Sequence, residues 1–192
     1  MTRILILQGH PDPSPARFGH ALATAYADAA RAAGHEVATV SVATLDFPLL
    51  RTQHEWQHGA LPPALQPVQQ AIARAEHLVL FFPLWLGGMP ALLKGLLEQV
   101  LRPGFAVPAG NPLTGPKPLA GRSARVVVTM GMPAAAYRWL FRAHSLKALE
   151  RNILGFVGIA PVRETLIGSV EGSDAARRRW LARLARLGRD GA

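Results

Sequence analysis

Residues that could hold a small anionic molecule follow the first apolar segment of this sequence. That segment, Arg3 to Gln8, ends at Gly9, and the loop after it contains His10, Ser14 and Arg17. Glycine lets a ligand approach the backbone, a serine hydroxyl can donate a hydrogen bond, and arginine adds a fixed positive charge. The helix expected next presents free N–H groups and the positive end of its dipole. These are the parts of a phosphate-binding loop.

The same loop can be explained without a ligand, as an ordinary turn between a strand and a helix. It matches neither the GxxxxGK[ST] pattern of nucleoside triphosphate sites nor the GxGxxG pattern of dinucleotide sites. A binding function therefore depends on what the other strand ends contribute.

A second stretch that can form a ligand-binding loop lies in the middle of the chain. Leu78 to Phe82 is continuously apolar, which predicts a strand buried on both faces, as in a parallel sheet between helical layers. From Met89 to Leu101 apolar residues recur with the spacing of an amphipathic helix. Pro83 to Gly88 lies between them, where a strand ends and a helix begins. That edge of an open parallel sheet is where ligands bind.

The rest of the chain continues the alternation of strand and helix. The patterns predict one α/β domain, residues 1–192, built as a three-layer sandwich from right-handed βαβ units. Long irregular segments are expected at 45–67 and 102–122, and no internal repeat is visible. The predicted strands are 3–8, 36–42, 78–82, 124–129 and 161–168, and the predicted helices are 18–33, 67–75, 89–101, 145–156 and one that Ser173 caps.

Composition narrows the possible functions. The chain has no cysteine, which removes disulfides, thiol nucleophiles and thiolate metal sites. No run approaches the roughly 20 apolar residues of a membrane span, and no leader precedes the first strand, so we expect a cytoplasmic protein without a membrane span. The net charge of +9 fits nucleic acid, an anionic cofactor or solubility. Six arginines from Arg177 to Arg189 share a helix with apolar residues, so we favour a solvated basic face and expect no nucleic-acid partner.

Two further patterns argue against other kinds of site. His54 and His58 have a spacing that can bind metal on a helix, but we expect an irregular segment there and no third ligand, so we predict no metal site. Ser145 follows a histidine without the G-x-S-x-G pattern of hydrolases.

Several segments taken together resemble the flavodoxin-like NAD(P)H:quinone oxidoreductases. The resemblance spans nearly the whole chain and is most specific in 82–95. It implies a sheet of order 2-1-3-4-5, with a flavin across the strand ends beside the first strand. The segments are Gly9-His10-Pro11, Phe18 four residues before Leu22, FPLWLGGMPALLKG at 82–95, Arg-Pro-Gly-Phe-Ala at 102–106, and Thr129-Met130-Gly131 followed by Tyr137.

The resemblance also implies which residues meet the cofactor, each set in a different loop. In the first loop, His10, Arg17 and Phe18 would hold the phosphate or pyrophosphate and the ribityl chain. The other two sets would contact the ring: Pro83, Leu84, Trp85 and Leu86 at its O4 and N5 edge, and Thr129, Met130, Gly131 and Met132 along its pyrimidine side.

Two catalytic candidates follow from the same resemblance. Tyr137 would stabilise negative charge at O2 and N1 of the reduced flavin. The family can pair this tyrosine with a histidine six residues later. That position is Ala143 here and His144 follows it, so His144 is the second candidate.

The resemblance implies a non-covalent FMN or FAD that takes hydride from NAD(P)H and reduces a quinone or similar acceptor. It also implies a homodimer with the active site near the interface. We expect the dimer surface to include Trp56, Phe105, Val107, Trp139, Leu140 and Phe141, which a five-stranded sheet does not need to bury.

Two alternatives stay open. One is a flavin-binding ancillary subunit of a membrane transporter. The other is a flavodoxin-type electron carrier, which the positive net charge disfavours because such carriers usually present an acidic face to their partners.

Overall fold

Five parallel strands form a sheet of order β2-β1-β3-β4-β5 in the computed structural model, which describes residues 1–107 and 115–192. The order is the one expected, and each strand lies within two residues of its predicted bounds. The strands are β1 (Arg3–Gln8), β2 (Glu36–Ser41), β3 (His77–Pro83), β4 (Ser123–Thr129) and β5 (Val162–Ile167).

The three central strands are the most apolar because both of their faces are covered. In β3 every residue from His77 to Phe82 is buried, and β1 and β4 are buried over almost all of their length. The edge strand β2 is partly exposed and carries a mixed sequence instead. The continuous apolar runs thus mark the strands that have a neighbour on each side.

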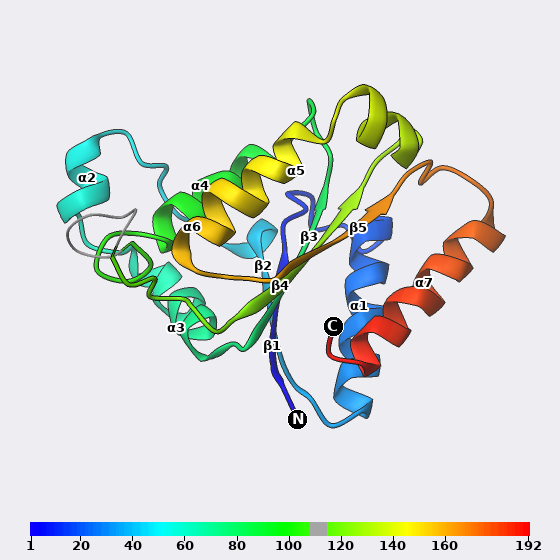
Figure 1. Ribbon diagram of the computed structural model, residues 1–192, viewed down its shortest axis with the longest axis horizontal. Helices are drawn as coiled ribbons and strands as arrows, with labels where there is room; N and C mark the ends of the chain where they lie inside the picture. The colour runs from blue at the N-terminus through cyan, green and yellow to red at the C-terminus, as the bar shows by residue number, and fades with distance from the viewer. Residues whose placement is uncertain (108–114) are drawn as a thin grey trace.

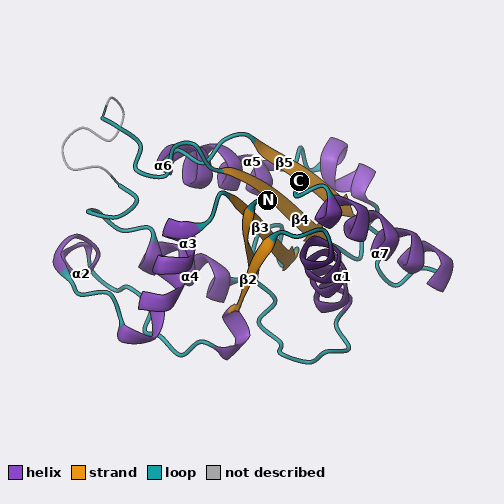
Figure 2. Ribbon diagram, turned by 90° about the horizontal axis from the view of Figure 1, so that it is seen from below, coloured by secondary structure: helices purple, strands orange, loops and turns teal. Residues whose placement is uncertain are grey.

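Helices cover both faces of the sheet (Figure 1). On one face α1 (Phe18–Ala32) and α7 (Asp174–Arg189) pack on each other and on the sheet. The other face is covered by α3 (Gln66–Arg74), α4 (Ala91–Val100), α5 (His144–Ala148), the π-helical segment η4 (Leu149–Leu154) and α6 (Gly155–Val157). Viewed from below, the sheet lies between the two helical layers (Figure 2). This confirms the three-layer prediction.

The predicted helix boundaries were mostly right, and their physical reasons are visible. Ser173 caps α7, its hydroxyl oxygen accepting a hydrogen bond from the N–H of Ala176 at 3.3 Å. The helix expected at 145–156 is a continuous run of α5, η4 and α6. Gly158, with φ of 104°, follows its last residue in the left-handed conformation that often ends a helix.

The prediction of an irregular segment at 45–67 was partly wrong. A helix, α2 (Gln53–His58), forms there, together with a short 3₁₀ turn, η2 (Pro63–Leu65), and another, η1 (Val42–Thr44), lies just before it. The hydroxyl oxygen of Thr52 accepts from the N–H of Glu55 at 3.1 Å, and the Glu55 carboxylate accepts from the N–H of Arg51 at 2.9 Å. The T-x-x-E spacing of a capping box was therefore present in the sequence.

The second irregular segment, predicted at 102–122, lies partly outside the described residues. In its first part the chain forms a turn, in which the N–H of Gly104 donates to the carbonyl oxygen of Val107 at 3.2 Å. Within 1–107 and 115–192, no helix is both long enough and apolar enough to cross a membrane.

Candidate functional site

A cavity of about 430 Å³ lies at the carboxyl edge of the sheet, where the loops after β1, β3, β4 and β5 meet. Its volume is within the usual range for small-molecule sites. This carboxyl edge is where ligands bind in an open parallel sheet, as predicted from the sequence. Nine of the thirteen predicted site residues line the cavity: His10, Arg17, Phe18, Pro83, Leu84, Trp85, Thr129, Met130 and Gly131.

Backbone hydrogen bonds join three of these loops to one another. The N–H of Leu84 donates to the carbonyl oxygen of Thr129 at 2.8 Å, which extends the pairing of β3 with β4 beyond the strands. The N–H of Met130 donates to the carbonyl oxygen of Ile167 at 2.9 Å, and that of Val170 returns to Met130 at 3.3 Å. The cavity wall is therefore held by the same ladder that holds the sheet.

The Pro83–Gly88 loop turns sharply at its tip. Trp85 and Gly88 exchange both backbone hydrogen bonds at 2.9 Å, and the two residues between them have positive φ, 46° for Leu86 and 78° for Gly87. This is the geometry of a two-residue hairpin turn with both central residues left-handed. Leu86 is fully exposed at the tip and does not line the cavity, unlike Trp85.

The first loop is held by a buried side chain that sequence reasoning missed. Gln8, 3% exposed, accepts from the N–H of His10 at 3.1 Å and donates to the carbonyl oxygen of Gly19 at 3.0 Å. It thus ties the end of β1 to the first turn of α1. The only sequence signal was a polar residue at the end of an otherwise apolar strand.

Gly9 is required by close packing rather than by a ligand. A Cβ atom at this position would lie 2.5 Å from Cδ2 of Leu93 and 3.0 Å from the carbonyl oxygen of Phe81. The N–H of Gly9 donates to that same carbonyl oxygen at 2.7 Å. The glycine therefore lets β1 and its loop lie against β3 and α4.

The hydrogen bonds of His10 fix its tautomer. Its Nδ1 accepts from the N–H of Asp12 at 3.0 Å, so the neutral ring carries its proton on Nε2. Burial, and secondarily the nearby charge of His20, lower the pKa of His10 below its usual value. Its ring packs edge-on against Trp85, with ring centroids 5.9 Å apart, and so brings the first and second loops together.

The amino end of α1 fits an anionic group. The helix has no side-chain cap and no acidic residue in its first turn. Its first two residues, Phe18 and Gly19, both line the cavity. The N–H groups at the start of a helix have no partner within the helix, so here they are available to a phosphate.

Two arginines line the cavity, and each already has a carboxylate partner. Arg17 Nε lies 2.7 Å from Oδ2 of Asp12, and a guanidinium nitrogen of Arg177 lies 3.2 Å from Oδ1 of Asp174. Arg177, which belongs to the predicted solvated basic face, has a side chain that is 42% exposed and also lines the cavity. The sequence contained a signal for this position. The carboxyl end of β5 is at the same sheet edge as the cavity, and Arg177 lies in the first turn of the helix that follows β5. Glu171 adds a negative charge to the wall.

Four predicted residues do not line the cavity: Leu86, Met132, Tyr137 and His144. Tyr137 is 2% exposed, and its hydroxyl lies 2.7 Å from Oγ of Ser145. His144 is exposed. The structure therefore pairs the tyrosine with the serine that follows the expected histidine.

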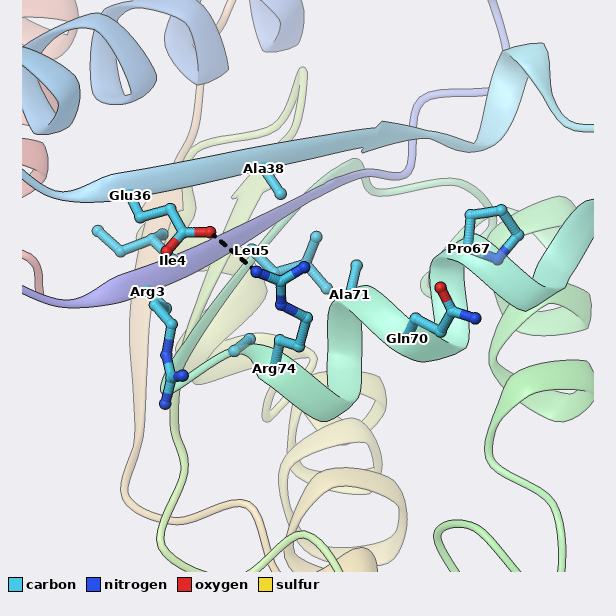
Figure 3. A pocket seen from close by; sticks show the side chains of 10 residues that line it. Arg3, Ile4, Leu5, Glu36, Ala38, Pro67, Gln70, Ala71 and Arg74 are labelled. Atoms are coloured by element: carbon cyan, nitrogen blue, oxygen red, sulfur yellow. Dashed lines mark ion pairs between the residues drawn. The ribbon is translucent and has the colours of Figure 1, made fainter.

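A second cavity, of about 180 Å³, lies between β1, β2 and α3 (Figure 3). Its charged residues are already paired: Arg74 with Glu36 at 3.6 Å, and Arg3 with Glu76 at 3.1 Å. Because these charges are already paired with each other, we do not assign this cavity a function.

The predicted interface residues separate into two places. Trp139, Leu140 and Phe141 are 78%, 76% and 53% exposed, whereas Val107 is buried and Phe105 and Trp56 are half-buried. Trp56 and Val107 line a small apolar groove instead. In this structure Trp139, Leu140 and Phe141 are therefore the exposed members of the six, and the expectation that the sheet does not bury Val107 was wrong.

His54 and His58 lie on α2 with ring centroids 5.1 Å apart, and not in an irregular segment. Across the parts of the chain that the structure describes, three or more His, Cys, Asp or Glu side chains nowhere come together as a metal site would require.

Comparison with known proteins places this geometry in a family. A family model described as the flavodoxin-like fold matches residues 2–188. An uncharacterized NAD(P)H oxidoreductase of Haemophilus influenzae is 28% identical over 185 residues, which cover 94% of this chain and 91% of that protein. The glutathione-regulated potassium-efflux system ancillary protein KefG of Escherichia coli is 43% identical over 75 residues, a stretch that spans 38% of each chain.

Solved structures share the fold. An NAD(P)H:quinone oxidoreductase from Methanothermobacter marburgensis superposes with a TM-score of 0.82 at 24% identity, covering 98% of this chain and 96% of that one. An FMN-dependent NADH-azoreductase from Bacillus anthracis, solved in complex with FMN, has a TM-score of 0.75 at 14% identity, with all of both chains covered. At these identities the likeness establishes the fold alone.

Proposed function

This chain belongs to the family with the flavodoxin-like fold, and we propose that it is a flavin-dependent NAD(P)H oxidoreductase that reduces a quinone or similar acceptor. The observation that carries the proposal is the cavity at the carboxyl edge, where the uncapped amino end of α1 meets the loops after β3 and β4. The names of similar proteins support it: NAD(P)H oxidoreductase, quinone oxidoreductase and FMN-dependent azoreductase. Because the cavity draws on residues from 10 to 177, we propose that the whole chain acts as one flavin-binding domain.

The residues of the cavity divide into an anion-binding end and an apolar end. We propose that the N–H groups of Phe18 and Gly19, together with Arg17 and Arg177, hold the phosphate of FMN or the pyrophosphate of FAD. The backbone of Pro83 to Trp85 and of Thr129 to Gly131 would orient the ring between two loops of the same ladder. A bound flavin would supply the hydride chemistry, since it can accept hydride from NAD(P)H and reduce the acceptor. Binding and orientation are the tasks of this chain.

We propose that Tyr137 acts at the rim of this site. It lies on the π-helical segment that follows the loop after β4, and its buried side chain is oriented by the contact of its hydroxyl with Ser145. Such a fixed hydroxyl could donate to an anionic ring. His144 remains a candidate only because it lies next to Ser145 in the sequence. Its side chain is exposed, and the hydroxyl of Tyr137 is hydrogen-bonded to Ser145 instead.

We also propose a homodimer with the mouth of the cavity near the interface. Among the residues described, eight large apolar side chains are exposed, and six of them, Trp85, Leu86, Met132, Trp139, Leu140 and Phe141, follow the carboxyl ends of β3 and β4. A concentration of apolar surface on one edge marks an interaction site, and two-fold pairing is the commonest way to cover it.

The second candidate is an ancillary subunit of a membrane transporter, which the match to KefG over part of the chain favours. This alternative also needs the flavin site, so flavin binding does not separate the two. Turnover does: a reductase reduces a soluble quinone rapidly in isolation, whereas an ancillary subunit would co-purify with its membrane partner. The third possibility, an electron carrier, fits poorly with a net charge of +9.

Reconstitution tests the proposal. The purified chain is titrated with FMN and with FAD, the visible spectrum of the washed complex is recorded, and the released cofactor is identified by mass. Bleaching of the flavin bands by NADH or NADPH under anaerobic conditions, and their return with a soluble quinone, is the expected result. Failure of both flavins to bind at micromolar concentration would leave the fold assignment intact and remove the proposed function.

A further inference from the structure

Asp12 is the centre of the first loop, since all four of its polar atoms are hydrogen-bonded. Its N–H donates to Nδ1 of His10 at 3.0 Å, and its carbonyl oxygen lies 2.8 Å from Nε2 of His20, which must therefore carry the proton. Its carboxylate accepts from the N–H of Ser14 at 2.8 Å and from Nε of Arg17 at 2.7 Å. The backbone bonds shape the loop, whereas the carboxylate bonds occupy its donors.

Those two donors are the kind that a phosphate uses. A backbone N–H in a turn and a guanidinium beside an uncapped helix start are typical partners of an anion. In this protein a carboxylate of the chain itself already engages them. The N–H of Ser14 and secondarily Arg17 lower the pKa of Asp12, so the carboxylate is ionised at neutral pH.

We propose that the Asp12 carboxylate competes with the phosphate of the bound flavin for Arg17, which lines the cavity, and thereby limits how tightly the phosphate-bearing cofactor is held. The inference rests on the proposed function, because it concerns the same cavity. Asp12 would thus lower the affinity for the cofactor, whereas a binding residue raises it. Removal of the Asp12 charge should therefore tighten binding.

Exposure sets the size of the effect. The side chains of Arg17 and Asp12 are 56% and 33% exposed, so water and salt screen their attraction. Exposed ion pairs of this kind contribute little free energy. Releasing Arg17 from the pair should therefore raise the affinity for the phosphate-bearing flavin by no more than about fivefold. The pair can therefore open at low cost when phosphate arrives.

The test compares Asp12→Asn with the wild-type protein in titrations with FMN and with riboflavin, followed by flavin fluorescence at low salt. Asparagine keeps an oxygen that can accept from the Ser14 N–H, so the turn is preserved while the charge is removed. Riboflavin lacks the phosphate and is the matched control ligand. We expect Asp12→Asn to bind FMN about threefold to fivefold more tightly, to bind riboflavin as the wild type does, and to lose its advantage as salt is raised.

A second pair of variants tests the route through Arg17. In the Asp12→Asn background Arg17→Ala should abolish the gain, and its cost there should exceed its cost in the wild type, where the guanidinium is already engaged. Equal or weaker FMN binding by Asp12→Asn would overturn the inference, as would an equal gain with riboflavin, because the carboxylate would then act only on loop shape. If no flavin binds to any variant, the proposed function fails and the inference fails with it. If flavin binds throughout but Asp12→Asn shows no gain, only the inference fails.

Discussion

The hydroxyl of Tyr137, on the π-helical segment η3 (Ala136–Leu140), lies 2.7 Å from Oγ of Ser145 on α5. Between them Arg142 and Ala143 have φ of 54° and 47°, so two successive left-handed residues reverse the chain. This reversal moves His144 to the surface and the serine towards the tyrosine. A motif that spacing alone would read as tyrosine and histidine is thus, in space, tyrosine and serine.

The first prediction concerns that pair. Tyr137→Phe should leave flavin binding within about twofold and lower the rate of flavin reduction by NAD(P)H by about tenfold or more, because a fixed donor to the charged ring is lost. Stopped-flow reduction measures it. Ser145→Ala frees the hydroxyl without removing it and should give a smaller loss. An unchanged rate in Tyr137→Phe would contradict the role of the tyrosine.

A second prediction separates Arg177 from its neighbours on α7. Arg177→Ala should weaken FMN binding by about fivefold, since a partly exposed, charge-assisted hydrogen bond contributes on the order of 1 kcal/mol. Arg178→Ala is the matched control, because Arg178 is exposed on the same helix and does not line the cavity. If both variants weaken binding equally, the general positive field of α7 is responsible and not a contact.

A third prediction follows from His77, which is 3% exposed at the start of β3. Its Nδ1 lies 2.8 Å from Oγ of Ser123, and its Nε2 has no hydrogen-bond partner among the described residues. Burial, and secondarily Arg125 and Arg163, lower the pKa of His77 from 6.5 to about 4. Between these values the unfolded chain binds a proton that the native state excludes. Stability should therefore fall as pH drops from about 6.5 to about 4, by about 3 kcal/mol in all.

Urea denaturation at several pH values in this window measures that fall. The carboxylates of the protein also contribute to the slope, so the comparison is with His77→Gln, which cannot titrate. The variant should show a shallower fall over the same window. Identical slopes for the two proteins would mean that His77 is accommodated as a cation.

The fourth prediction tests the dimer. Trp139→Glu places a charge in the exposed apolar group and should shift the protein from dimer to monomer in light scattering at low micromolar concentration, with a parallel loss of turnover. Ala182→Glu is the control, as it adds the same charge at an exposed position on α7. A wild-type protein that is monodisperse at 20.6 kDa and still reduces quinone would rule out a shared site.

Local pattern was enough to predict most of the fold. The continuous apolar run at Leu78–Phe82 indicates a strand buried on both faces, and the spacing from Met89 to Leu101 indicates the helix after it. Parallel strands place their carboxyl ends at one edge, so the convergence of three loops followed from the order of elements. These features depend on neighbours in sequence. The strand order came from resemblance to a family, because pairing between distant strands leaves no local signal.

The partners of polar side chains were decided only by the tertiary structure. Gln8 holds the first loop because α1 returns to within reach of the end of β1, and Arg177 lines the cavity because α7 begins beside the same edge. Ser145, and not His144, is the partner of Tyr137 because Arg142 and Ala143 are left-handed. Arginine and alanine rarely adopt this conformation, so the sequence does not predict it. Hydrogen bonds act over about 3 Å, so a shift by one residue along the chain is enough to change which side chain is the partner. The apolar pattern averages over many residues and is unchanged by such a shift.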